Sequence, residues 1–128
     1  MSSGDDIMDC IFCKIVKGDI PSYTIYEDDI VKVFLDIHPH VNGHLLVIPK
    51  KHYVDILDIE EDVLKYIYKE IAPKMYDLLK SKLHATGLSI GQNNGTAQDV
   101  KHYHVHLIPR YKRDSQLLDV KEIYEKLK

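Results

Sequence analysis

The spacing of hydrophobic residues changes along the chain between period two and period three or four, which separates predicted strands from predicted helices. Runs rich in β-branched, aromatic and other apolar residues, each bounded by turn residues, predict five strands, at 23–26, 30–35, 44–48, 88–92 and 100–109. Only the acidic turn 27–29 separates the first two runs, so these two predict a hairpin.

The longest predicted element is a helix over 59–83, in which apolar residues recur at three- and four-residue steps. Asp58 is expected to cap this helix, and Pro73 is expected to kink or split it. A short N-terminal helix is predicted over 10–16 and a terminal helix over 117–127. Strands paired as hairpins around one main helix predict an α+β fold with an antiparallel sheet.

Length and charge limit the kind of protein this can be. The chain has 128 residues, so we expect one domain over 1–128, with a flexible N-terminus at 1–9 and a helical extension at 114–128. It carries 17 basic and 20 acidic residues, a net charge of −3, which argues against nucleic-acid and membrane partners. No apolar run is long enough for a bilayer, and residues 1–9 lack the basic residues of a targeting peptide. We therefore expect a cytoplasmic protein that could also enter the nucleus.

The densest chemical signal is the segment 102–106, in which His102, His104 and His106 alternate with Tyr103 and Val105. On a strand, the three histidines would share one face, with successive ones about 7 Å apart, while the residues between them point into the core. Two functional interpretations stay open: a three-histidine metal site, or nucleophilic catalysis at phosphorus by a neutral imidazole. The turn at 93–99 leads into this segment, and its small residues leave backbone N–H groups free for an anion, which favours phosphorus chemistry.

The chain has two cysteines, Cys10 and Cys13, in a C-x-x-C pattern. The loop between them is too short for a disulfide to stabilise the fold, so the pattern indicates metal ligands or a redox pair. A redox pair is expected within a thioredoxin-like βαβ pattern, which the following sequence lacks. Zinc would need two further ligands, and the eight histidines are the available supply.

At these residues the chain resembles the histidine triad (HIT) superfamily, in particular its Hint branch. His-Tyr-His-Val-His-Leu-Ile fits the pattern of three histidines that alternate with apolar residues. The segments Cys-Ile-Phe-Cys-Lys-Ile-Val-Lys-Gly-Asp-Ile-Pro, Tyr-Glu-Asp-Asp, Phe-Leu-Asp-Ile, Gly-His-Leu-Leu-Val-Ile-Pro-Lys-Lys-His and Leu-Ile-Pro-Arg are similar in order and type. The resemblance covers about residues 10–113. It implies a HIT-like fold and a homodimer in which two five-stranded sheets form one sheet of ten strands.

The resemblance also implies an activity. Hint-like proteins are purine nucleotide-binding hydrolases that cleave the P–N or acyl-phosphate bond of AMP derivatives, such as adenosine 5′-phosphoramidates, through a nucleotidyl-histidine. Two alternatives remain. One is a dinucleoside polyphosphate hydrolase of the Fhit type. The other is a nucleotide-binding regulator with weak catalysis and protein partners, similar to protein kinase C-interacting relatives.

The family's functional residues can be placed on this sequence motif by motif. The resemblance makes His104 the nucleophile, has His106 bind the phosphoryl oxygens and assist the leaving group, and has His44 support them. Asp36 would hold the ribose hydroxyls. The residues implied in substrate binding are Ile20, Phe34, Asp36, Ile37, Asn93, Gln98, Asp99 and Val100. Among these, Ile20, Phe34 and Ile37 would form the slot for the base.

The same resemblance implies a structural zinc ion, with no cofactor needed for catalysis. Its four ligands would be Cys10, Cys13, His52 and His102. One departure from the family pattern concerns the phosphate turn, which is about two residues shorter and has Asp99 where a hydroxyl residue is usual. A carboxylate repels a phosphate, so the departure puts the catalytic rate in doubt, although Lys101 is expected to offset the charge.

Overall fold

The sheet holds the whole molecule together. The computed structural model describes residues 9–113 and 116–128. Its five strands form one antiparallel sheet in the order β1-β2-β3-β5-β4. They are β1 (Thr24–Glu27), β2 (Val31–Leu35), β3 (Leu45–Pro49), β4 (Gly87–Gln92) and β5 (Val105–Arg110). The predicted α+β class with a five-stranded antiparallel sheet is confirmed.

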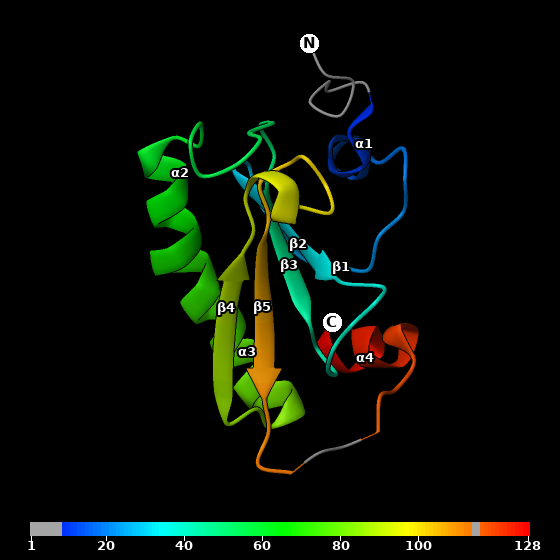
Figure 1. The fold of residues 1–128 in the computed structure, drawn as a ribbon. Coiled ribbons are helices and arrows are strands. Elements are labelled where there is room, and N and C mark those ends of the chain that lie inside the picture. The colour runs from blue at the N-terminus through cyan, green and yellow to red at the C-terminus, as the bar shows by residue number, and fades with distance from the viewer. Residues whose placement is uncertain (1–8, 114–115) are drawn as a thin grey trace.

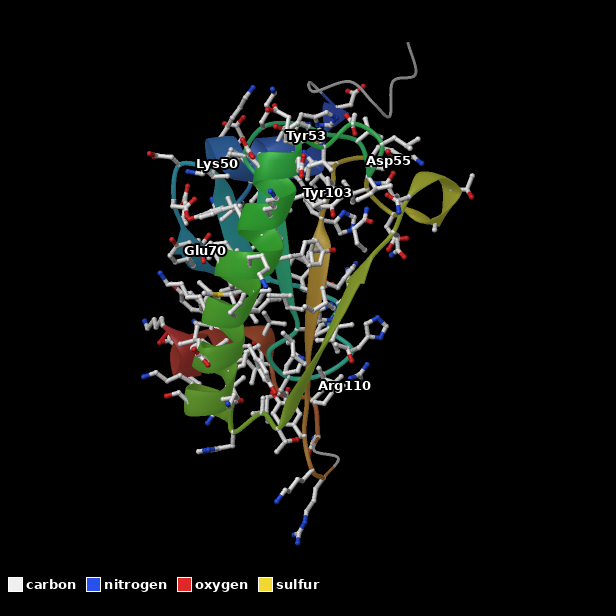
Figure 2. The ribbon with its side chains drawn as sticks, turned by 90° about the vertical axis from the view of Figure 1, so that its left-hand side faces the viewer. Lys50, Tyr53, Asp55, Glu70, Tyr103 and Arg110 are labelled. Atoms are coloured by element: carbon white, nitrogen blue, oxygen red, sulfur yellow. The ribbon has the colours of Figure 1, made fainter. Side chains whose placement is uncertain are left out.

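The helices lie on both faces of this sheet. They are α1 (Ile11–Lys17), α2 (Glu61–Tyr66), η3 (Ile67–Ile71), α3 (Ala72–Leu83) and α4 (Val120–Leu127), in addition to the single turn η4 (Gly95–Ala97) between β4 and β5. The continuous column α2–η3–α3 covers one face, while α1 lies beside the other face near one end of the strands (Figure 1). Figure 2, seen from the helical side, shows this column in front of the sheet. Within the described ranges, no helix has both the length and the apolar composition needed to cross a membrane.

Each face of the sheet has its own core, so every residue of β2 and β3 is buried. Toward the helical column, Val33 and Val47 join a cluster that includes Ile67 and Leu79. On the opposite face, the apolar side chains of α1 pack against the strands in a second cluster, formed by Cys10, Phe12, Cys13, Ile15, Phe34, Leu46 and Ile48. The second cluster attaches the N-terminal helix, and the two cysteines with it, to the face that carries the histidines.

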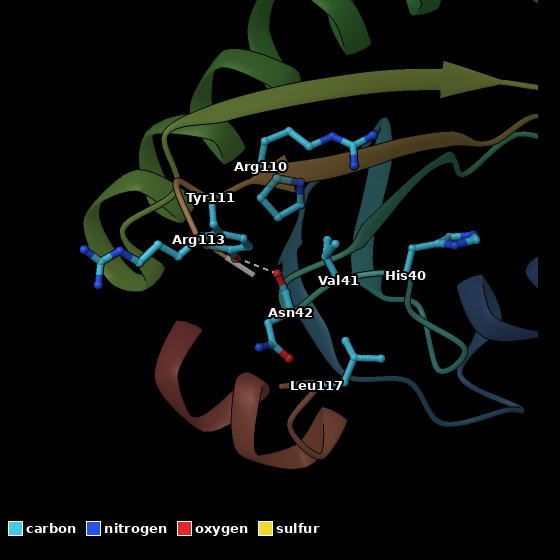
Figure 3. A pocket seen from close by; sticks show the side chains of 8 residues that line it. His40, Val41, Asn42, Arg110, Tyr111, Arg113 and Leu117 are labelled. Carbon is cyan, nitrogen blue, oxygen red and sulfur yellow. Dashed lines mark hydrogen bonds between the residues drawn. The ribbon is translucent and has the colours of Figure 1, made fainter. Parts of the chain in front are cut away.

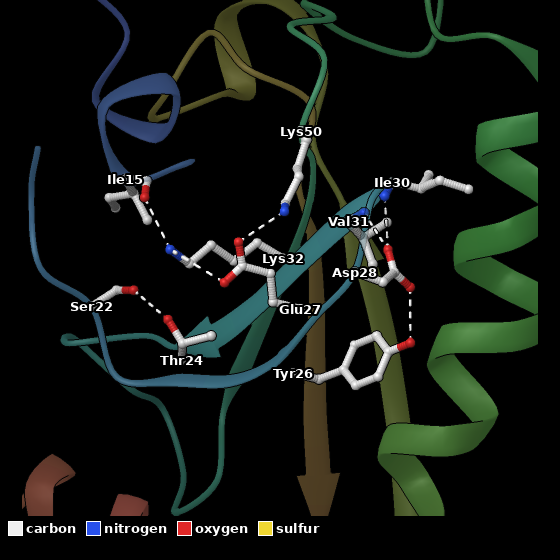
Figure 4. Close-up of polar contacts among 10 residues, drawn as sticks. All are labelled: Ile15, Ser22, Thr24, Tyr26, Glu27, Asp28, Ile30, Val31, Lys32 and Lys50. Atoms are coloured by element: carbon white, nitrogen blue, oxygen red, sulfur yellow. Dashed lines mark hydrogen bonds and ion pairs between the residues drawn. The ribbon is translucent and has the colours of Figure 1, made fainter. Parts of the chain in front are cut away.

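Polar contacts fix α1 against β2 (Figure 4). The buried Lys32 donates from its ammonium to the carbonyl of Ile15 near the end of α1, at 3.0 Å. Glu27 lies 3.9 Å from the same ammonium and 2.8 Å from that of Lys50. Because a buried charge must be compensated, these contacts favour one placement of α1 on the sheet.

The helical column begins later than predicted, at Glu61, and Asp58 does not cap it. The Asp58 carboxylate instead accepts the backbone N–H groups of Val54 and Asp55, which close the preceding turn. At Pro73 the column continues, but its hydrogen-bonding pattern changes just before: the N–H of Ala72 donates to Ile67, five residues back. This π-type turn accommodates a proline, which lacks an N–H and would clash with a regular preceding turn.

The terminal helix is also shorter than predicted. α4 begins at Val120, where the Asp119 side chain accepts the N–H of Lys121 and so caps the helix. Its buried residues are Ile123 and Leu127, as its apolar spacing predicts. The predicted flexible segment 1–9 lies almost wholly outside the described residues.

Candidate active site

The strand that carries the histidines is shorter than the predicted 100–109. β5 begins at Val105, so His102 and His104 precede it and only His106 lies within it. The neighbouring strand β3 ends at Pro49, which has no N–H for a ladder, and its carbonyl accepts the Nε2 hydrogen of His102 at 2.9 Å. The side chains still alternate, since Tyr103 and Val105 belong to the core under the helical column.

His104 is held in a single orientation and a single tautomer. Its ring is buried and packs edge-on against Phe12, with centroids 5.1 Å apart. Its Nδ1 lies 2.8 Å from the carbonyl oxygen of His102. Because a carbonyl only accepts hydrogen bonds, Nδ1 carries the hydrogen, and in the neutral ring Nε2 then keeps its lone pair. His104 therefore presents an unprotonated nitrogen, as a nucleophile must.

A chain of hydrogen bonds makes Nε2 of His106 a hydrogen-bond donor, unlike Nε2 of His104. The backbone N–H of His40 donates to Nδ1 of His44 at 3.1 Å, so Nε2 of His44 carries the hydrogen. This Nε2 lies 3.0 Å from Nδ1 of His106, which accepts, so Nε2 of His106 is the donor. Asp36 lies near this chain, with Oδ2 at 3.7 Å from Nε2 of His44. The result is one nitrogen that accepts, on His104, beside one that donates, on His106.

The turn before β3 positions His44 for this role. Gly43 has φ +84, and a Cβ there would lie 2.7 Å from a methyl carbon of Leu83. Glycine is therefore needed both for the backbone conformation and for the close approach to α3. The carbonyl of His44 accepts the N–H of Asp36 at 3.0 Å, which ties the two ends of the loop together.

Burial keeps His44 and His106 neutral. It lowers the pKa of His44 to about 4, although the Asp36 carboxylate acts in the opposite direction. Burial, followed by the nearby His104, also lowers the pKa of His106. Near pH 7 both rings are uncharged, so the assigned tautomers are the relevant states.

His104 and His106 face a cavity of about 320 Å³. Its wall is largely apolar and comes from α1, the segment after it and β2. The predicted substrate-binding residues that line it are Ile20, Phe34, Asp36, Ile37, Asp99 and Val100. Ile37 is 65% exposed, so a planar base seated beside it would cover apolar surface that water now contacts.

Two of the eight predicted substrate-binding residues do not line this cavity. Gln98 is buried and donates to the carbonyl of Val54 at 2.6 Å, and Asn93 is exposed on the turn. The ammonium of Lys101 donates to the carbonyl of Gly95 at 2.6 Å, and no ion pair joins it to Asp99 among the described residues. The Asp99 carboxylate therefore lies at the cavity without the expected partner.

Sequence reasoning missed the part that α1 plays in this wall. Ile11, Phe12 and Ile15 all line the cavity. The sequence did contain a sign of this role, since the three residues lie next to the two cysteines. A metal cluster that fixes Cys10 and Cys13 also fixes the side chains between and after them.

Cys10, Cys13, His52 and His102 bring one donor atom each to within 4.8 Å of one another. Nδ1 of His102 lies 3.3 Å from the sulfur of Cys10 and 3.2 Å from Nδ1 of His52, which is 3.2 Å from the sulfur of Cys13. Tetrahedral zinc with two sulfur and two nitrogen ligands requires donor separations of about 3.3–3.8 Å. The donor set and its spacing fit zinc, with no position left for a substrate.

The three triad histidines do not converge on a common point. His102 belongs to the cysteine cluster, while His106 groups with Asp36 and His44. Among the described residues, His104 belongs to neither group. This geometry gives no support to a catalytic metal bound by all three.

The fold and the site define a histidine-triad protein, and comparisons agree. The HIT domain model matches residues 17–113. An uncharacterized HIT-like protein of Methanocaldococcus jannaschii is 44% identical over 116 residues, which are 89% of this chain and 88% of that protein. The adenosine 5′-monophosphoramidase of Schizosaccharomyces pombe is 39% identical over 80% of this chain and 75% of its own length. A zinc-bound histidine triad family protein from Mycobacterium smegmatis has a similar structure, with a TM-score of 0.87, 36% identity, and coverage of 95% of this chain and 92% of that one. The chain belongs to the HIT family.

Proposed function

We propose that the protein hydrolyses adenosine 5′-phosphoramidates, or the corresponding acyl phosphates, through a nucleotidyl intermediate on His104. The observation that carries this proposal is the pair of fixed tautomers at one cavity: the lone pair on Nε2 of His104 and the hydrogen on Nε2 of His106. A relative named as an adenosine 5′-monophosphoramidase supports the choice of substrate.

The cavity offers complementary chemistry to a nucleoside. Its apolar wall, which includes Ile20, Phe34 and the exposed Ile37, suits a purine ring. Asp36 lies at the same cavity, and a carboxylate can accept hydrogen bonds from two ribose hydroxyls. With the nucleoside placed there, the α-phosphorus would lie beside the two histidines.

In the first step, Nε2 of His104 attacks the phosphorus and forms a new N–P bond. The P–N bond to the leaving amine breaks, and its electron pair remains on the amine nitrogen. That nitrogen takes a proton from the solvent, while the Nε2–H of His106 donates a hydrogen bond to a phosphoryl oxygen and stabilises the charge that develops there. The hydrogen bond from His104 to the carbonyl of His102 stabilises the positive charge that develops on the attacking ring.

In the second step, a water oxygen attacks the phosphorus of the intermediate. The N–P bond to His104 breaks, and its electrons return to Nε2 as the lone pair. The water gives up one proton, AMP is released, and the protein recovers its original state. His44 keeps His106 in its donating tautomer through both steps because its own Nδ1 stays bound to the N–H of His40.

We further propose that the cysteine–histidine cluster holds a structural zinc ion. When bound, zinc would link α1 to the segment before β5, and it would keep the cysteines as thiolates. The hydrogen bond from His102 to Pro49 directs Nδ1 toward the other three donors, as second-sphere contacts do in zinc sites. The relative from Mycobacterium smegmatis, which binds zinc, supports this proposal.

A homodimer through β4 would complete the ten-stranded sheet that the resemblance implies. β4 is an edge strand, and Ile90 on it is 44% exposed. An edge of this kind can pair with a second copy. We expect a dimer mass by light scattering, and a monomer for an Ile90→Pro variant whose circular dichroism is unchanged. A wild-type monomer would contradict this assembly.

One observation favours a second function, a nucleotide-binding regulator with weak catalysis. Asp99 lies at the cavity beside both histidines, where its charge would oppose a phosphate. A regulator would bind nucleotides and turn them over slowly, and the activity of an Asp99 variant would separate the two functions.

The direct test uses adenosine 5′-phosphoramidate under single-turnover conditions with wild type and a His104→Ala variant. We expect AMP release by wild type alone, and an adenylylated protein on acid quenching. Diadenosine tetraphosphate serves as the comparison substrate, and faster cleavage of it would favour the Fhit type. Binding of AMP without turnover of either substrate would overturn the proposed hydrolase.

A further inference from the structure

A second cavity, of about 250 Å³, lies on the same face of the sheet, at the end of β5 (Figure 3). Val41, Pro109, Tyr111 and Leu117 form its less polar part, and His40, Asn42, Arg110 and Arg113 form its polar part. None of the described residues that line it is acidic. The proposed mechanism does not use this cavity.

Arg110 points from this cavity back toward the triad. His106, Ile108 and Arg110 alternate onto one face of β5, which places the backbone of Arg110 about 13 Å from that of His106. The Arg110 side chain shortens this separation, because its Nε donates to Oγ of Ser89, the residue opposite Ile108 in the β4–β5 pairing, at 2.9 Å. Figure 3 shows the side chain extended back along β5.

His40 connects the two cavities. It lines the second cavity, and its ring lies 5.3 Å from that of His44, centroid to centroid. The ring of His44 lies 5.2 Å from that of His106, which faces the first cavity. The order along the sheet is therefore the nucleoside cavity, the reacting histidines and then the second cavity.

Two arginines line the second cavity, Arg110 and Arg113, and Arg110 is the one whose side chain extends back along β5 toward the triad (Figure 3). Arg110 is exposed, and its hydrogen bond to Ser89 uses Nε only. Among residues 9–113 and 116–128, no hydrogen bond or ion pair engages its two terminal nitrogens. Two parallel N–H groups are suited to a carboxylate or a phosphate.

We propose that this second cavity binds the leaving group of the substrate, and that Arg110 selects leaving groups that carry an oxyanion, either a carboxylate or a phosphate. This inference rests on the proposed function. With the nucleoside in the first cavity, the leaving group departs opposite the attacking nitrogen of His104, on the side of His106. Arg110 lies further along the same face of the sheet in this direction.

The test compares two adenosine 5′-phosphoramidates that differ in one group: one has β-alanine as the leaving amine and the other has β-alaninamide. We expect Arg110→Gln to lower the ratio of their kcat/KM values, carboxylate over carboxamide, by roughly 10-fold or more, as for a lost charged hydrogen bond. The ratio cancels effects on folding and on the chemical step. Cleavage of diadenosine tetraphosphate, whose leaving group carries phosphates, tests in the same variants whether Arg110 recognises a phosphate.

Three matched variants sharpen this measurement. Lys69→Gln removes an exposed positive charge from the helical column on the opposite face of the sheet and should leave the ratio unchanged. Ser89→Ala removes the contact that orients Arg110 and should lower the ratio by a smaller factor, and Arg110→Lys should restore part of it.

The possible failures are distinguishable. If wild type cleaves the carboxamide substrate but Arg110→Gln leaves every ratio unchanged, the inference is wrong and the proposed function stands. A loss in Lys69→Gln equal to that in Arg110→Gln would also overturn it. If wild type cleaves none of the substrates, the proposed function fails and the inference fails with it.

Discussion

His102 and His104 are two residues apart, yet their rings expose opposite nitrogens. In His102, Nε2 is bound to the carbonyl of Pro49, and Nδ1 faces the donor atoms of the other three residues in the cysteine–histidine cluster. In His104, Nδ1 is bound to the carbonyl of His102, and Nε2 is left for the cavity. The same side chain is thus a ligand in one place and a nucleophile in the other, because a backbone carbonyl fixes which nitrogen is free.

The surroundings of the two histidines differ in the same way. The cluster around His102 is closed, with Cys10, Cys13 and His102 all buried, while His104 and His106 border a cavity. A closed set of metal ligands stabilises the fold, whereas a cavity with fixed hydrogen-bond donors and acceptors can bind a substrate and promote its reaction. Changes to one group should therefore leave the property of the other largely intact.

The largest expected effect is on turnover, from His104→Ala. We expect the single-turnover rate to fall by at least about 10³-fold, because the variant lacks the nitrogen that forms the bond to phosphorus. The thermal midpoint should change little compared with that of a cluster variant. Retention of more than a tenth of the wild-type rate would mean that His104 is not the nucleophile.

The next effect concerns the residue that orients His106. His44→Phe fills the same buried space but removes the donor to Nδ1 of His106, which can then adopt either tautomer. We expect kcat to fall by roughly 10²-fold, the usual range for loss of one hydrogen-bond donor to a developing negative charge, with AMP affinity nearly unchanged. An equal fall in AMP affinity, measured by calorimetry, would show that His44 shapes the binding site instead.

For the cluster, the expected effect is on stability. Cys13→Ser, or prolonged incubation with a chelator, should lower the free energy of unfolding by several kcal/mol through loss of the metal. Turnover at low temperature should persist after brief chelation, because none of the proposed steps uses the metal. Immediate and complete loss of activity on chelation, with the fold intact by circular dichroism, would instead indicate a catalytic metal.

Local patterns predicted much of this fold. The alternation from 102 to 107 placed Tyr103 and Val105 in the core, although β5 begins only at Val105. The start of the strand was not predictable, because it depends on Pro49 in a strand more than fifty residues away. Asp58 was wrongly expected as a helix cap because the N–H groups of Val54 and Asp55 compete for its carboxylate.

The candidate site was predictable where its chemistry follows from neighbours in sequence. The pairing of His44 with His106 came from resemblance, and the structure adds the hydrogen bonds that assign their tautomers. The contribution of α1 to the cavity depends on a tertiary contact, from Lys32 to the carbonyl of Ile15. Gln98 faces Val54 and not the cavity, which no local pattern indicates.

A fall in pH should also lower the stability, by less than the loss of the metal cluster does. Burial lowers the pKa of His44 from an ordinary value of 6.5 to about 4. Between these values the unfolded chain takes up a proton that the folded protein does not, so stability falls as the pH falls from about 6.5 to about 4. The expected loss from His44 is about 3 kcal/mol by urea unfolding, and His44→Phe should remove this part of the pH dependence. An unchanged pH profile in that variant would assign the loss to other groups.

The smallest expected effect, an increase in rate, comes from Asp99. Its carboxylate lies at the cavity with His104 and His106, and the ammonium of Lys101 is bound to Gly95 instead. Asp99→Ser removes a negative charge and supplies a hydroxyl donor, so we expect kcat/KM for the phosphoramidate to rise roughly threefold to tenfold, more at low ionic strength. Asp99→Asn, which removes the charge alone, should show the electrostatic part of the gain. If both variants are slower than wild type, the Asp99 carboxylate contributes to the reaction, and repulsion of the phosphate is not its main effect.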